Sequence, residues 1–115
     1  MSEADRLADH LRQMSEGSRD AMAFTEGMDR AGFLSDLRTQ RAVVMSLMIV
    51  GEAAARIVGD HPAFAEAHPD IPWRSIRGMR NRIAHGYFDV DLGVVWQTVE
   101  VELPTLIDRL EALQN

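Results

Sequence analysis

The stretch from residue 42 to residue 50 constrains the fold more than any other part of the chain. Its sequence is Ala-Val-Val-Met-Ser-Leu-Met-Ile-Val, so a helix here is apolar nearly all round. Such a helix must lie at the centre of a bundle, or be shared between a core and a partner. We therefore predict a central helix from an N-cap near Ser35 to Gly59. Its small and apolar residues recur at helical spacing, at Leu37, Val44, Met48, Gly51, Ala55 and Val58.

Two helices are predicted around this central one in the N-terminal half. The first covers about residues 2 to 28 and begins with Ser2 and Asp5, a pair typical of a capping box. A short helix is expected just after residue 60, with Pro62 at its first position. Both are compatible with short connections between antiparallel neighbours.

Two more helices are predicted in the C-terminal half. One covers about residues 73 to 84 and ends close to Gly86. The last begins at Asp89 or Asp91 and carries an apolar stripe to the end of the chain. Pro104 lies inside it, so a kink is expected over the four residues before this proline.

These patterns favour an all-α fold. Three long helices and two short ones, joined by short loops, describe an antiparallel helical bundle. The chain has 115 residues and is 46% hydrophobic, which suits one core, so residues 1–115 are expected to form a single domain.

Composition limits the compartment and the chemistry. The chain has no cysteine, which excludes disulfides, thiolate metal sites and a thiol nucleophile, and favours a reducing compartment. Its first residues are acidic and do not resemble a secretory signal. The apolar run at 42–51 is far shorter than the roughly 20 residues that cross a bilayer. We therefore expect a cytoplasmic protein with no membrane partner. His61 and His68 lack the spacing of paired metal ligands, so no metal site is expected.

Positive charge is concentrated in one segment. The formal net charge is −6, and all of the positive charge is Arg. Four of the 12 Arg lie between residues 71 and 88, a stretch without any acid, at Arg74, Arg77, Arg80 and Arg82. This asymmetry predicts a local anion site on an acidic body, or alternatively a solvated basic helix face.

The same segment contains Arg80, four residues, His85, one residue and Tyr87, which is the only Tyr in the chain. The Arg-x4-His spacing alone is weak, because chance produces it often. The Tyr two residues later makes the pattern far more specific. Five residues on a helix turn the chain by about 500°, so Arg80 and His85 point about 140° apart. Either the chain bends at 84–86, or a second subunit completes the site.

Several motifs together resemble the HepT family of HEPN domains. They are Glu52 within Ile49–Ala53, the Ile71-Pro72-Trp73 turn, the Gly78–Asn81 lead-in, the Arg-x4-His-x-Tyr core, and the Val95-Trp96 and Leu103-Pro104 pairs. The resemblance extends from about Asp5 to Leu113. It implies a metal-independent endoribonuclease toxin without cofactor, dimeric, and encoded with a minimal nucleotidyltransferase antitoxin. It also implies that Arg80 and His85 are catalytic and that the antitoxin attaches AMP to Tyr87.

The chemistry of RNA cleavage agrees with these roles. A proton must leave the 2′-hydroxyl, another must reach the leaving 5′-oxygen, and charge on the phosphate must be neutralised. A His can transfer protons near neutral pH and an Arg is a fixed cation. Arg77, Asn81 and Arg82 are expected to support substrate binding.

Structural alternatives exist for each of these residues. Arg80 is a natural partner for Glu52, a lone carboxylate in an apolar helix, and we expect Glu52 to be a buried residue that orients Arg77 or Arg80. His85 suits a helix C-terminus, where a cation interacts with the dipole. Tyr87 suits a half-buried cap on the bundle. The competing function is a non-catalytic helical module that binds a nucleotidyltransferase or a nucleotide.

Overall fold

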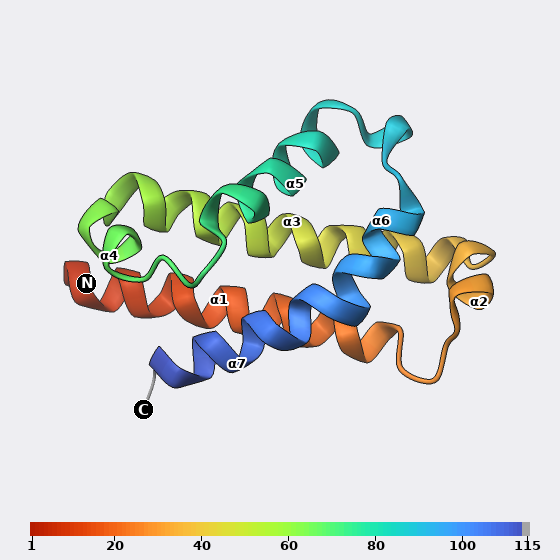
Figure 1. The fold of residues 1–115 in the computed structure, drawn as a ribbon. Coiled ribbons are helices and arrows are strands. Elements are labelled where there is room, and N and C mark those ends of the chain that lie inside the picture. Colours follow the sequence, from red (N-terminus) through yellow and green to blue (C-terminus); the bar gives the residue numbers. More distant parts are fainter. Residues whose placement is uncertain (114–115) are drawn as a thin grey trace.

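The computed structural model describes residues 1–113, and within them it is an all-α bundle without strands. Its long helices are α1 (Glu3–Phe24) and α3 (Leu37–Asp60), and α5 (Trp73–His85) follows the short helix α4 (Pro62–Ala67). The C-terminal arm consists of α6 (Leu92–Gln97), a π-type turn η2 (Thr98–Glu102) and α7 (Leu103–Leu113). Figure 1 shows that α1, α3, α5 and α7 alternate in direction. The predicted antiparallel bundle is confirmed.

The central helix is α3, as the apolar stretch predicted. It packs against α1 on one side and α5 on another. Gly17 of α1 allows the close contact between α1 and α3, because a Cβ there would lie 2.8 Å from Val50 Cγ2 and 3.2 Å from the Ser46 carbonyl oxygen. The core has its largest share of buried side chains from α3, with others from α1, α5 and the C-terminal arm, among them Met14, Val43, Leu47, Ala54, Ile57, Ile83, Val95 and Leu106.

By length and composition, α3 is also the one helix within residues 1–113 that would be able to span a membrane. An 18-residue window in it has a mean hydropathy of 1.7. Half of that window is buried inside the bundle, and buried core helices of soluble proteins have the same composition. Its apolar character is therefore accounted for by its central position.

The connection before α3 differs from the prediction. The first helix ends at Phe24 and not near residue 28, and Gly27 takes a positive φ of 78° in the turn that follows. A short helix α2 (Arg30–Leu34), capped by Asp29, was not predicted, and Ser35 ends it where we expected the N-cap of α3. Asp36 caps α3 instead, its side chain accepting from the Thr39 N–H.

Aromatic packing explains why this unpredicted helix forms. Phe33 is fully buried and its ring lies 5.5 Å from that of Trp96, measured between centroids. The pairing fixes α2 against α6. A five-residue helix has too few turns to produce an apolar period, so tertiary contacts decide it.

Other end signals are confirmed. Ser2 and Asp5 form the predicted capping box. Asp91, one of the two predicted starts, caps α6, whereas Asp89 lies in the single 3₁₀ turn η1 (Tyr87–Asp89). The expected kink before Pro104 coincides with η2, whose wider π-type turn accommodates a proline that has no N–H to donate. The last long helix is thus divided into two.

Candidate active site

A close contact between α3 and α5 positions the site. A Cβ built on Gly51 would lie 2.2 Å from Arg80 Cβ, so only glycine allows the two helices to approach this closely here. The start of α5 is fixed separately, because the Trp73 indole N–H donates to the carbonyl oxygens of Ala65 and His68, each 3.1 Å away. Together these contacts place Arg80 beside the residue that follows Gly51, which is Glu52.

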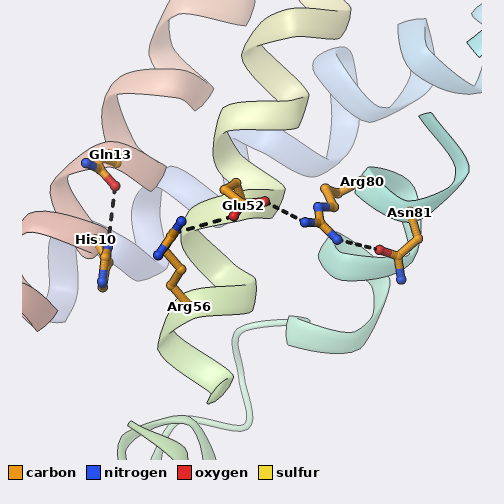
Figure 2. Close-up of polar contacts among 6 residues, drawn as sticks. All are labelled: His10, Gln13, Glu52, Arg56, Arg80 and Asn81. Atoms are coloured by element: carbon orange, nitrogen blue, oxygen red, sulfur yellow. Dashed lines mark hydrogen bonds and ion pairs between the residues drawn. The ribbon is translucent and has the colours of Figure 1, made fainter. Parts of the chain in front are cut away.

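The Arg80 guanidinium is held by two hydrogen bonds (Figure 2). Its Nη2 donates to Glu52 Oε2 at 2.6 Å and its Nη1 donates to Asn81 Oδ1 at 2.9 Å. The buried Nε has no partner. A guanidinium has four N–H groups on its two Nη atoms, so two remain for a ligand. The side chain is 30% exposed, which leaves them access to solvent.

Glu52 holds two cations rather than one. Its Oε1 lies 3.4 Å from Arg56 Nε, one turn further along α3. Of the two partners expected for Glu52, the structure has Arg80 and not Arg77. The expected burial is wrong, because the Glu52 side chain is 45% exposed at the rim of the α3–α5 contact. Sequence reasoning missed Arg56, although its i, i+4 spacing from Glu52 was a usable signal.

His85 is the last residue of α5 and is exposed. Within residues 1–113 its imidazole makes no hydrogen bond or ion pair, and it does not contact Arg80. The chain stays helical through His85 and leaves the helix only at Gly86, whose N–H bonds to the Arg82 carbonyl. Of the two alternatives that the sequence left open, the structure therefore does not have the first, a bend before His85 that would bring the two side chains together in one subunit.

The remaining predicted residues divide between two faces of α5. Arg77 is exposed, and so is Asn81, whose amide NH₂ stays unused when its Oδ1 accepts from Arg80. Arg82 points to the other side, where it lines a groove with Met79 and Val94. In the part of the chain that the structure describes, neither Arg77 nor Arg82 forms an ion pair.

Tyr87 lies in η1 just beyond the helix end and is about half exposed. It is not among the side chains that pack against the hydrophobic core, and part of its ring faces solvent. Its ring packs edge-on against Phe88, with centroids 5.9 Å apart and planes at 83°. Phe88, almost fully exposed, was not singled out from the sequence, because its residue type favours burial.

Among the described residues, no group of three or more His, Asp or Glu side chains is arranged to hold a metal ion. His61, the nearest approach to such a group, has its Nδ1 3.7 Å from Glu3 Oε1 and its ring 6.3 Å from that of His10. The side chains with a chemical use at the candidate site are thus Arg, Glu, Asn, His and Tyr.

Comparison with known proteins matches this chain to a family. The family model described as "Ribonuclease HepT-like" matches residues 14–113. A protein of Thermococcus cleftensis named "Probable ribonuclease HepT" is 39% identical over 107 residues, which are 93% of this chain and 94% of that protein. A Methanocaldococcus jannaschii protein named a "Putative RNase" is 32% identical over 111 residues, covering 96% of this chain and 98% of its own length. No solved structure matches the chain significantly.

Proposed function

The chain belongs to the HepT-like ribonuclease family, and we propose that it is a metal-independent endoribonuclease toxin that acts as a homodimer in the cytoplasm. One observation carries the proposal. Within residues 1–113, Arg80 is held in place by Glu52 and Asn81 while keeping two N–H groups, and His85 is exposed and makes no hydrogen bond at the end of the same helix. A fixed cation and a free imidazole are the two groups that metal-free RNA cleavage requires.

The reaction we propose is an in-line attack within the RNA. The 2′-oxygen forms a bond to the adjacent phosphorus while its proton passes to a base, and the bond from phosphorus to the 5′-oxygen breaks as that oxygen takes up a proton. The products are a 2′,3′-cyclic phosphate and a 5′-hydroxyl. His85 serves the proton transfers, and Arg80 neutralises charge on the phosphate oxygens. Arg77, Asn81 and Arg82 support binding of the strand.

A second subunit supplies what one chain lacks. Arg80 and His85 do not meet in one subunit, whereas a two-fold dimer would set each Arg80 near its partner's motif and bring two His together. An exposed face of α3 suits such an interface. Met45 is 61% exposed and Ile49 is 43% exposed, and both lie at helical spacing from Glu52 and Arg56. Covering these apolar side chains would place the Arg80–Glu52 pair at the interface.

The test of activity uses purified protein, total RNA and a chelator. Wild type should cut RNA, and His85→Ala should abolish cutting and growth inhibition while keeping a cooperative helical fold. Equal cleavage by wild type and variant would show that the site assignment is wrong. An absence of cleavage by wild type would favour a non-catalytic module that binds a nucleotidyltransferase or nucleotide, for which Arg80 serves only as the structural partner of Glu52.

The test of assembly is sedimentation. We expect a dimer at micromolar concentration, and Met45→Glu should shift it to monomer because a carboxylate would be placed in an apolar interface. Because Met45 is exposed in the single subunit, the variant should keep the helical fold of that subunit. A wild-type monomer at that concentration would contradict the dimer.

Regulation is proposed to act on Tyr87. A minimal nucleotidyltransferase partner would transfer AMP from ATP to the tyrosine oxygen, with pyrophosphate as the leaving group. Each transfer adds a phosphodiester anion near the Arg cluster, which competes with the RNA phosphate and inactivates the enzyme without a change of fold. The hydroxyl is on a half-exposed side chain, as modification requires.

Intact mass spectrometry after incubation with the partner and ATP tests this assignment. Adducts of AMP mass should appear on wild type and not on Tyr87→Phe. The variant should still cut RNA, and it should be more toxic than wild type in cells that carry both genes. Adducts that persist on Tyr87→Phe would disprove the assignment.

A further inference from the structure

Phe88 is the most exposed large apolar side chain among the described residues, at 98%. It lies in the middle of η1, three residues after His85, and the only aromatic contact on its ring is the edge-on pairing with Tyr87. Leaving a whole benzyl group in water forgoes the favourable free energy of burying it. A ring in this position, next to a candidate catalytic residue, is available to a ligand.

A polar stripe on α5 leads to this ring. Arg74, Arg77, Asn81 and His85 follow one another at steps of three or four residues, so their directions on the helix lie within about 80° of one another. All four are exposed, and neither Arg74 nor Arg77 forms an ion pair within residues 1–113. From first to last the stripe is about 16 Å long at 1.5 Å per residue, enough to follow more than one nucleotide.

We propose that Phe88 is a base-stacking residue and that the substrate is RNA whose nucleotide beside the cut is unpaired. This inference rests on the proposed function. Phosphates follow the Arg74–His85 stripe, and the base flanking the scissile bond stacks on the Phe88 ring. A cationic track that ends in an exposed aromatic ring is the combination by which proteins hold single strands. In an A-form duplex both faces of a base are covered by its neighbours, so only an unpaired base can stack on the ring.

The charges around Phe88 favour RNA over a protein partner. Residues 71–88 contain four Arg and no acid, so the surface leading to Phe88 is cationic. A phosphate chain neutralises this surface and an aromatic base covers the ring in one ligand. The alternative to RNA is that a second copy of this chain, whose net charge is −6, covers the Phe88 ring, and the experiment below distinguishes the two.

Binding of a single-stranded RNA that carries 2-aminopurine tests the inference. Wild type should quench the probe as its base stacks, and Phe88→Leu should weaken binding by about tenfold and remove the quenching. Phe88→Trp should restore both, because an aromatic face is what the base needs. Phe24→Leu is the matched control, since Phe24 is a half-exposed aromatic on α1 away from the stripe. The same sequence as a duplex should bind wild type and Phe88→Leu equally.

The inference is overturned by wild-type affinity and quenching in Phe88→Leu, or by an absence of quenching with wild type. It is also overturned by a Phe88→Leu protein that sediments as a monomer when wild type is a dimer, because that result would assign the ring to the interface between copies. Failure of the proposed function is distinguishable from these results. If RNA binds in a Phe88-dependent way but is never cut, the ribonuclease proposal is wrong and the stacking site stands. If Phe88→Leu cleaves RNA with an unchanged KM, only the stacking proposal is wrong.

Discussion

Within the described residues, Arg12 and Arg19 on α1 have acidic partners, whereas the exposed Arg74 and Arg77 on α5 have none. On α1, Arg12 pairs with Asp9 at 3.1 Å and with Glu16 at 3.5 Å, and Arg19 pairs with Glu111 of α7. The hydrogen bond that Arg12 donates to the Asp9 carboxylate, followed by the charge of Glu16, raises the pKa of Arg12 above its ordinary value. On α5, Arg74 and Arg77 have no acidic partner in the described part of the chain. Paired cations form a solvated helix face, whereas unpaired cations on one face are free for an anion.

Arg80 stands between these two cases. It has an acidic partner, but that partner comes from another helix and leaves two of its N–H groups unused. An ion pair of this kind orients a cation without neutralising its capacity to bind. We propose that the difference between α1 and α5 is one of function, and the following substitutions test this proposal in order of expected effect.

The largest effect is expected from Arg80→Ala compared with Arg12→Ala. Removing Arg80 should lower kcat for RNA cleavage by about 100-fold or more, as the loss of a group that stabilises developing charge does. Removing Arg12 should leave kcat unchanged, because its ion pairs are exposed and distant from the motif. Single-turnover assays at saturating enzyme measure the rate of cleavage by each variant. Similar losses in the two variants would contradict the proposed difference between α1 and α5.

Next in size is the effect of an added methyl group at the two helix junctions. Gly51→Ala should lower the free energy of unfolding by about 1–3 kcal/mol and also impair cleavage, since its Cβ would displace Arg80 at the α3–α5 contact. Gly17→Ala meets Val50 and Ser46 at the α1–α3 contact, so it should cost stability without affecting cleavage by the folded fraction. Urea titration and cleavage rates of the same samples separate the effect on stability from the effect on cleavage. Full activity in folded Gly51→Ala would show that the close approach is not needed for function.

A smaller effect is expected from Glu52→Gln. The amide keeps the shape but replaces the carboxylate by a neutral acceptor, so Arg80 is held less firmly and kcat should fall by about tenfold with KM little changed. Arg56→Gln, which removes the other partner of Glu52, should change kcat less than twofold because that pair is largely exposed. A rise in KM at constant kcat would mean that Glu52 affects binding and does not position Arg80.

The smallest effect concerns salt. Arg77→Gln should reduce the slope of log affinity for single-stranded RNA against log salt by about 0.7, the value for one lost phosphate contact. Arg19→Gln should not alter the slope, because Arg19 is already paired with Glu111. Equal slopes for Arg77→Gln and wild type would place the RNA phosphates elsewhere.

The helices were largely predictable because their signals are local. The all-round apolar stretch identified α3, and the Ser2–Asp5 pair identified the start of α1. The short helix α2 was not predicted, because its buried Phe33 packs against Trp96, a residue about 60 positions away in the sequence. Contacts across such a separation leave no period in the sequence.

The candidate site could be proposed from the sequence residue by residue, but its geometry could not be predicted. The need of Glu52 for a cationic partner could be anticipated, whereas the choice of Arg80 depends on where α5 crosses Gly51. The same crossing leaves Glu52 half exposed. Phe88 could not be recognised, because only the end of α5 and the turn η1 place its ring in solvent.

The chemistry of the RNA ends tests the central claim most directly. Wild type in the presence of a chelator should leave a 2′,3′-cyclic phosphate and a 5′-hydroxyl at each cut, because we propose that the 2′-oxygen is the nucleophile and that His85 and Arg80 act without a metal. His85→Ala should leave no such ends. Fragments with 3′-hydroxyl and 5′-phosphate ends, or cyclic phosphate ends formed equally by His85→Ala, would contradict the account.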